Sequence, residues 1–390
     1  MKITGIRTRA ISFSRAPITL RSHLVSPTSV FTDHNEKSWF GPCSIVLVEV
    51  TTDEGITGIG TAGGFTSSPK EIIDRHFTPL LIGENPLNNE LIWEKMYRSS
   101  VRIGRKGAVS CAISGIDIAL WDIKGKFFNA PVYQLIGGKT KEKIRVYASR
   151  LYALDDLDQL RDEAIGYKKQ GFTMLKQRFG FGPGDGYEGM RRNEELIRTV
   201  REAVGDDIVL AADAYMGWDV PYTLEMARRL APYNLSWIEE PLMPHDIDGY
   251  AFLAEKSPIP ISCGEHEYTR WGFRELIEKT RIRILQPDAN RVGGITESLK
   301  ICALASAHDR VVVPHSNEAH NLHVITSQPV CPFMEYFPNV EPDTGNEIFW
   351  KIFKGEPVAE NGFVVPPEKP GLGIEINEEA VSGLILDDRL

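Results

Sequence analysis

Three acidic residues, each at the end of an apolar run, could together hold a metal ion. Asp213, Glu239 and Glu265 follow one another at intervals of 26 residues, which predicts that they lie at the same height on adjacent strands. Carboxylates brought close together repel one another strongly unless a cation lies between them. An all-oxygen ligand set favours Mg²⁺ first and Mn²⁺ second. The alternative for each acid alone is a helix N-cap or a solvated loop residue.

Asp288 and His315 end two further runs and could form a proton-transfer pair. A carboxylate that accepts a hydrogen bond from one imidazole nitrogen leaves the other nitrogen free to act as acid or base near neutral pH. We therefore expect His315 to be the main acid/base and Asp288 to orient it. Asn290 or a backbone group is the alternative partner of Asp288.

Two basic residues and one further acid also lie at the ends of apolar runs. Lys176 and Arg178 flank Gln177, so both point to the same face of a strand. They could bind and polarise an anionic substrate, or they could simply neutralise the barrel carboxylates. Glu335 ends the last run and would donate a hydrogen bond from the far rim if protonated. Its alternative is an ion pair with Lys176 or Arg178.

The elements that carry these residues alternate between short β-branched runs and amphipathic helical segments. This alternation is typical of a parallel sheet, and eight units in about 190 residues fit a (β/α)8 barrel, whose active site lies at the C-terminal ends of its strands. An open doubly wound sheet normally carries a glycine fingerprint after its first strand, and none follows Ser149. The eight runs are 144–149, 174–177, 208–213, 236–239, 259–265, 283–288, 311–315 and 332–336.

The barrel pattern is flanked by segments of different character. Residues 45–59 read as a hairpin with a turn at Asp53-Glu54-Gly55, and residues 114–126 read as a helix. A long polar loop spans 14–42, and loops of that length are usually functional. We therefore expect an α/β protein in three parts, listed in chain order: an α+β N-terminal capping domain (1–135), the (β/α)8 barrel (140–340) and a C-terminal segment that packs back on the cap (341–390).

The glycine-rich run 180–186 lacks the Lys-Ser/Thr that follows the glycines of a phosphate-binding loop. We interpret it as a flexible loop after the second barrel strand.

Composition excludes several classes of protein. The chain has 44 Lys+Arg against 53 Asp+Glu, a formal net charge of −9, which argues against binding nucleic acid or anionic membrane through bulk charge. No apolar run is long enough for a transmembrane helix. Five dispersed cysteines without C-x-x-C pairing indicate reduced thiols, and the N-terminus does not read as a secretory signal. We expect a cytoplasmic protein that self-associates.

Several segments together resemble the enolase superfamily, in its mandelate racemase subgroup. They are SGIDIALWDIKGK (114–126), AADAY (211–215), WIEEP (237–241), GEHEY (264–268), PDANRVGG (287–294) and VPHS (313–316). The resemblance implies that Asp213, Glu239 and Glu265 bind Mg²⁺, that Lys176 and Arg178 match a Lys-x-Lys/Arg pair, that Asp288 and His315 form the dyad, and that Glu335 is the rim acid. It also implies that the N-terminal part closes over the substrate, with Arg21 and His23 as candidate specificity residues.

Within the subgroup the chain is most similar to acid-sugar dehydratases of the L-rhamnonate and L-lyxonate type, in which His266 matches a histidine that contacts substrate. The resemblance implies dehydration of a sugar acid to a 2-keto-3-deoxy acid through an enediolate. A racemase or epimerase of a 2-hydroxy acid is the alternative, and a non-catalytic binding barrel is a third. Arginine at 178 is a poor base, which favours His315 as the main acid/base, although either His315 or the Lys176/Arg178 side could take the C2 proton. Dipeptide epimerases and cycloisomerases carry a lysine where Asp288 stands, which argues against both.

Overall fold

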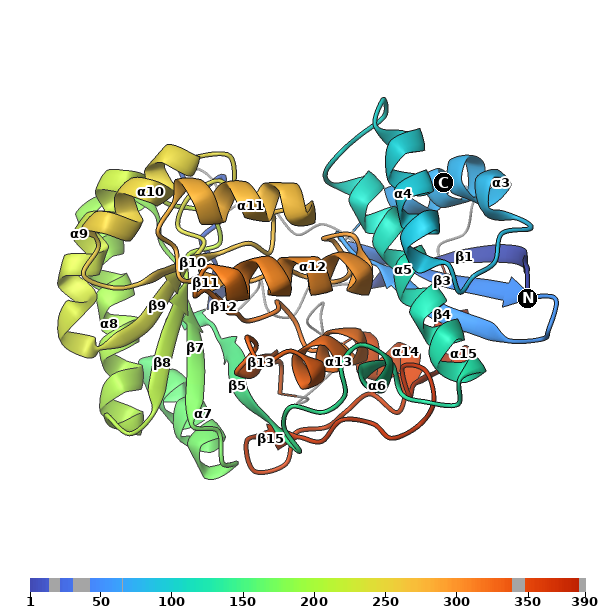
Figure 1. The fold of residues 1–390 in the computed structure, drawn as a ribbon. Helices are drawn as coiled ribbons and strands as arrows, with labels where there is room; N and C mark the ends of the chain where they lie inside the picture. The colour runs from blue at the N-terminus through green and yellow to red at the C-terminus, as the bar shows by residue number, and fades with distance from the viewer. Residues whose placement is uncertain (14–21, 31–42, 65, 339–347, 386–390) are drawn as a thin grey trace.

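The computed structural model of the chain describes residues 1–13, 22–30, 43–64, 66–338 and 348–385. Eight parallel strands curve around one half of the molecule, and a three-stranded antiparallel sheet with its helices forms the other half (Figure 1). The (β/α)8 barrel and the N-terminal α+β cap expected from the sequence are therefore both present.

The barrel strands follow one another in sequence order, and the last lies beside the first because β13 pairs with β5. Within the described part of the chain, no ladder joins β12 to β13. One backbone hydrogen bond, from the amide of Val312 to the carbonyl of Val330 at 3.1 Å, lies beside this seam. The strands are β5 (Ile144–Leu151), β7 (Met174–Arg178), β8 (Val209–Asp213), β9 (Leu235–Glu239), β10 (Ile261–Cys263), β11 (Ile284–Leu285), β12 (Val311–Val312) and β13 (Phe333–Tyr336).

One α-helix lies between each pair of successive barrel strands, and several start where an aspartate caps the first turn. The side chains of Asp156, Asp219 and Asp246 accept hydrogen bonds from the free N–H groups of α7, α9 and α10. The helices are α7 (Leu157–Lys169), α8 (Gly186–Val204), α9 (Val220–Leu230), α10 (Ile247–Lys256), α11 (Thr269–Lys279), α12 (Gly294–Ala307) and α13 (Ala319–Ser327).

The capping domain is built on the predicted hairpin. β1 (Ile3–Phe13) pairs with β3 (Cys43–Thr52), which pairs with β4 (Thr57–Ala62), all antiparallel. The long helix α5 packs across this sheet, with Ile113 and Ile116 buried against Val46 and Val48. The helices of this domain are α2 (Ser68–Ile72), a π-helical turn (Ile73–Phe77), α3 (Thr78–Leu81), α4 (Asn89–Ser100), α5 (Ala108–Phe127) and α6 (Val132–Leu135).

Buried hydrogen bonds fix the cap to the barrel. Asp117 of α5 accepts from the backbone and the hydroxyl of Thr296 in α12, at 2.9 and 2.5 Å. Thr61 of β4 donates to the side chain of Asn290 at 2.5 Å, two residues beyond Asp288. The cap therefore contacts a loop that also carries one of the predicted catalytic residues.

The C-terminal segment contacts both halves. β15 pairs with β5 of the barrel, while the amide of Leu372 donates to Asp122 of α5 at 2.8 Å. Arg9 of β1 forms an ion pair with Glu378 at 2.6 Å. The tail thus completes the cap as expected, although the exact limits of the three parts stay a prediction. Its elements are α14 (Ile348–Ile352), β14 (Phe353–Lys354), β15 (Phe363–Val364), β16 (Glu375–Ile376) and α15 (Glu378–Ser382).

Aromatic and aliphatic side chains fill the barrel interior below its C-terminal end. Trp237 stacks on Phe333 and meets Tyr147 edge to face, and Met174 and Val313 pack in the same cluster. On β7, β8 and β9 these interior positions lie two residues before the polar ends, so they form a floor under the polar groups. Among the described residues, each helix is either too short or too polar to cross a membrane.

Candidate active site

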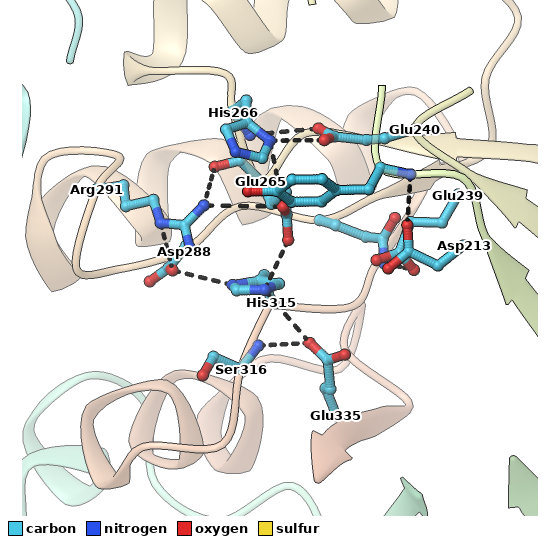
Figure 2. A network of polar contacts seen from close by, with 12 residues as sticks. Asp213, Glu239, Glu240, Glu265, His266, Asp288, Arg291, His315, Ser316 and Glu335 are labelled. Atoms are coloured by element: carbon cyan, nitrogen blue, oxygen red, sulfur yellow. Dashed lines mark hydrogen bonds and ion pairs between the residues drawn. The ribbon is translucent and has the colours of Figure 1, made fainter. Parts of the chain in front are cut away.

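Polar side chains from seven of the eight barrel strands, or from the loops that follow them, meet at the C-terminal end of the barrel. Figure 2 shows most of them in one network of hydrogen bonds and ion pairs. The predicted residues that the structure brings into this network are Lys176, Arg178, Asp213, Glu239, Glu265, His266, Asp288, His315 and Glu335.

Lys176 is fully buried and contacts three carboxylates. Its ammonium nitrogen lies 2.5 Å from Glu239, 2.7 Å from Glu335 and 3.7 Å from Asp213. Burial alone would lower the pKa of Lys176, but these three acids raise it above its ordinary value. In this arrangement the three carboxylates favour the charged ammonium form of Lys176.

Strand register places Arg178, Asp213 and Glu239 side by side on β7, β8 and β9. Arg178 donates to Asp213 at 2.7 Å. The second oxygen of Glu239 accepts from Gln286 at 2.6 Å and from the indole of Trp237 at 3.1 Å. The equal height predicted for Asp213 and Glu239 is confirmed. The two cations neutralise these carboxylates, which is one of the two alternatives for the basic pair, and their binding of an anionic substrate stays a prediction.

The same prediction is wrong for Glu265. In the ladder Glu239 pairs with Ser262, so Glu265 lies three residues farther along, beyond the end of β10. Gly264, with φ of +131°, makes the turn that carries it there. Glu265 then reaches inward, and one of its oxygens lies 2.6 Å from Nε2 of His315. Equal spacing in the sequence did not give equal height in the barrel, because β10 ends at Cys263 and Glu265 lies in the loop that follows this strand.

Asp288 and His315 form the expected pair. Oδ2 of Asp288 lies 3.0 Å from Nδ1 of His315, while its other oxygen accepts from the amide of Asn290 at 2.8 Å. Arg291 holds Asp288 from the other side at 3.1 Å. The carboxylate therefore contacts both partners that the sequence left open, and His315 directs Nε2 toward Glu265 (Figure 2).

Glu335 is fully buried and ionised. Lys176 lies 2.7 Å from one oxygen, and the amide of Ser316 donates to the other at 2.7 Å. Burial would raise the pKa of Glu335, but Lys176 and His315 lower it to about 2. The ion-pair alternative thus describes Glu335 better than a protonated donor does.

The barrel mouth holds more acids than fixed cations. Burial raises the pKa of Asp213, and it raises that of Glu239 to about 7 although Lys176 opposes the shift. Burial would lower the pKa of His315, but the charge of Glu265 keeps it well above its usual value. This excess of carboxylates over fixed cations favours the binding of an added cation. The acids of the network are Asp213, Glu239, Glu240, Glu265, Asp288 and Glu335, and its fixed cations are Lys176, Arg178 and Arg291.

A second cluster lies next to Glu265. Nδ1 of His266 lies 2.6 Å from Glu240 and 3.2 Å from Glu265. Ligand atoms of Glu240, Glu265 and His266 all lie within 4.8 Å of one another, whereas the trio predicted from the sequence does not appear as such a compact group in the described chain. The assignment of Asp213, Glu239 and Glu265 as metal ligands therefore stays a prediction.

The cap approaches the barrel mouth through residues 22–30. β2 (Ser22–His23) pairs with β6 (Ala153–Leu154), and the ring of His23 lies 3.0 Å from Asp155 and 4.9 Å from the ring centre of Phe181. Arg21, the other predicted specificity residue, lies outside the described residues.

Glycines let this cap segment pack closely on the loops of the barrel. A Cβ on Gly217 would lie 2.7 Å from the carbonyl oxygen of Ser26 and 2.5 Å from Val25. A Cβ on Gly182 would lie 3.0 Å from the Cβ of Ser29. The carbonyl of Ser29 accepts a hydrogen bond from the amide of Gly184 at 3.1 Å. The run 180–186 is thus a packing surface for the cap rather than simply a flexible loop.

Sequence reasoning gave no role to Glu240 or Arg291. Glu240 directly follows Glu239, but its partner His266 lies about one strand-and-helix unit away along the chain. Arg291 lies three residues after Asp288, which it contacts, and it also approaches Glu265 of the preceding unit. For Glu240 the signal available was a second charged residue directly after a strand end.

Comparisons with known proteins agree with this architecture. Residues 159–380 match the family described as enolase C-terminal domain-like. Residues 38–137 match the N-terminal domain of mandelate racemase and muconate lactonizing enzyme.

Individual relatives match over almost the whole chain. The L-rhamnonate dehydratase of Saccharopolyspora erythraea is 36% identical over 366 residues, covering 92% of this chain and 90% of that protein. The structure of rhamnonate dehydratase from Gibberella zeae complexed with Mg is 36% identical with a TM-score of 0.86, covering 98% and 96% of the two chains. The 3,6-anhydro-D-galactonate cycloisomerase from Zobellia galactanivorans is 32% identical with a TM-score of 0.84, covering 99% and 100%.

Proposed function

Because the chain belongs to the mandelate racemase/muconate lactonizing enzyme family of the enolase superfamily, we propose that it is a Mg²⁺-dependent acid-sugar dehydratase. The substrate is an aldonate of the L-rhamnonate or L-lyxonate type, and the product is a 2-keto-3-deoxy acid. The observation that carries the proposal is His315, which is held by Asp288 and lies beside Glu265, together with Lys176, which is ion-paired with Glu239. The named dehydratases of similar sequence support the reaction class.

Asp213, Glu239 and Glu265 are the proposed ligands of Mg²⁺. The three donors are buried oxygens, as this hard ion prefers, and the surplus of acids at the barrel mouth fits an added cation. When bound, Mg²⁺ would stabilise the negative charge that develops on the substrate carboxylate. It would also weaken the effect by which the charge of Glu265 raises the pKa of His315.

His315 is the proposed acid and base. A carboxylate only accepts hydrogen bonds, so Asp288 fixes the proton of the neutral imidazole on Nδ1 and leaves the lone pair on Nε2. Nε2 takes the C2 proton, and the electron pair of the broken C–H bond forms the enediolate. The protonated ring then gives this proton to the C3 hydroxyl, which leaves as water while the C2–C3 double bond forms. The resulting enol becomes the 2-keto-3-deoxy acid.

The basic pair supports a dehydratase rather than a racemase. Two-base racemisation needs a second group that can take a proton on the opposite face of C2. Burial would lower the pKa values of Lys176 and Arg178, but the acids that they contact raise both above their ordinary values. We propose that both assist as cations by attracting the anionic substrate.

Incubation with a panel of aldonates tests the proposal. We expect one or more L-sugar acids to give a 2-keto-3-deoxy product with Mg²⁺, and no product after EDTA treatment or with His315→Asn. Proton NMR in D₂O separates the other reactions. Deuterium at C2 of recovered substrate without keto acid would indicate a racemase or epimerase, and an isomer formed without loss of water would indicate a cycloisomerase. No reaction with any sugar acid would contradict the proposal.

Self-association and a cytoplasmic location are further parts of the proposal that rest on the sequence. Sedimentation of the purified chain tests the first.

A further inference from the structure

Glu240 directly follows β9 and lies opposite the ring of His266 (Figure 2). One of its oxygens is 2.6 Å from Nδ1 of His266. The other accepts from the backbone amides of Gly264 and His266, at 3.2 and 3.3 Å. Only 2% of the surface of Glu240 is exposed, so these contacts replace almost all of the water around its carboxylate.

The backbone of Glu240 is held in a conformation that L-residues rarely adopt, with φ of +37°. Its amide donates to the carbonyl of Ser262 at 2.9 Å, and Pro241 follows it. Such a conformation costs about 1 kcal/mol or more and persists where the surrounding structure fixes it. The strain marks Glu240 as a residue whose placement the fold maintains.

The contacts determine which nitrogen of His266 is available. A carboxylate accepts but does not donate, so Nδ1 carries the hydrogen that faces Glu240. Among the described residues Nε2 has no hydrogen-bond partner, while the side chain is 21% exposed. The ring of Tyr215 meets that of His266 edge to face at 5.5 Å and limits its rotation.

We infer that Glu240 is a positioning residue, which binds Nδ1 of His266 so that Nε2 is presented to a hydroxyl group of the substrate. Glu240 parallels Asp288, because each carboxylate lies at Nδ1 of a histidine whose ring contacts Glu265. The two imidazoles approach Glu265 from different elements, one from its own loop and one from the loop after β12 (Figure 2). The part of the inference that concerns the substrate rests on the proposed function, whereas the positioning of the ring does not.

The ring itself provides the first test. In two-dimensional ¹H–¹⁵N spectra of the full-length protein with labelled histidine, assigned by comparison with His266→Asn, we expect His266 to be protonated at Nδ1. Glu240→Gln and Glu240→Asp, which weaken the acceptor or shorten its reach, should shift the signal toward a mixture of tautomers. Glu267→Gln is the matched control, because Glu267 is about as buried as Glu240 and directly follows His266, but contacts Lys106 and the amide of Tyr268. An unchanged His266 signal in both Glu240 variants would overturn the inference.

A double-mutant cycle provides the second test, on the aldonate that the wild-type protein converts. Glu240→Gln should lower kcat/KM by about tenfold or more in the wild-type background. It should have less than about a threefold effect when His266 is already asparagine, because the two residues act as a unit. Equal losses in both backgrounds would indicate a merely structural role and would contradict the inference. If no aldonate reacts with the wild-type protein, the proposed function fails, and the tautomer measurement still decides whether Glu240 positions His266.

Discussion

At the scale of single residues, the chemistry of the barrel mouth depends on how buried charges are shared. Lys176 has no solvent exposure, and two acids lie within 2.7 Å of its nitrogen. Removing one partner of a buried ion pair leaves the remaining charges without compensation, which costs more than the pair contributes.

We therefore expect Lys176→Met to lower the free energy of unfolding by about 3 kcal/mol or more. The physical reason is the repulsion among Glu239, Glu335 and Asp213, which the ammonium group of Lys176 relieves in the wild-type protein. Urea unfolding followed by tryptophan fluorescence measures the loss. Lys168→Met, which removes a surface contact with Asp207, is the control and should change stability by less than about 1 kcal/mol. Similar losses in the two variants would argue against this account.

Asp288 should matter through the tautomer of His315. In Asp288→Asn the amide can donate to Nδ1, so part of the imidazole population carries its proton on Nε2 and cannot accept from C2. We expect kcat to fall by about 100-fold or more while the affinity for Mg²⁺ is unchanged. Steady-state kinetics and calorimetry on the same variant check both parts. A variant that retains near-normal kcat would contradict the role assigned to Asp288.

At the scale of elements, residue patterns predicted the strands well but could not give the geometry of their ends. All eight runs form strands because each is a short buried segment next to a helix. The runs at 259–265, 283–288 and 311–315 shrink to strands of two or three residues, since their last residues leave the ladder to line the site. Glu265 was misplaced for this reason, and Glu240 was missed because its partner His266 is close only in the folded chain.

The packing of the cap segment 22–30 on glycines gives a prediction at the same scale. Gly217→Ala would place a methyl group against Ser26 and Val25 and lift this segment from the barrel. Since the segment carries His23, a predicted specificity residue, we expect KM for the aldonate to rise by about tenfold while kcat changes less. Gly166→Ala is the control, because nothing lies within 4 Å of the added methyl group in α7. It should leave KM unchanged and slightly stabilise the helix. Equal KM values for the two variants would contradict this role of Gly217.

At the scale of the whole molecule, one buried histidine joins the cap, the barrel and the tail. Nδ1 of His323 in α13 accepts from the amide of Tyr133 in α6 at 3.1 Å, and Nε2 donates to the carbonyl of Leu372 at 3.1 Å. The bond from Tyr133 requires the neutral ring, because a proton on Nδ1 would remove the lone pair that accepts this bond. Burial accordingly lowers the pKa of His323 to about 4.

Stability should therefore depend on pH in a defined direction. The unfolded chain binds a proton on this histidine below its ordinary pKa of about 6.5, whereas the folded chain resists protonation down to pH about 4. The contribution of the neutral ring is complete above pH about 6.5 and is lost as the pH falls toward 4, by up to roughly 3 kcal/mol. Urea midpoints at pH 7.5 and 5 measure it. His323→Gln should show a smaller difference between the two pH values than the wild-type protein, and an equal difference would contradict the assignment.

The central claim is that Asp213, Glu239 and Glu265 together bind Mg²⁺ at the barrel mouth. Calorimetric titration of the EDTA-treated protein with Mg²⁺ tests it most directly, with Glu239→Gln and Asp213→Asn alongside. The account predicts one ion per chain in the wild-type protein and an affinity lower by about tenfold or more in each variant. Binding of equal strength in all three proteins, or no binding to the wild-type chain, would contradict it.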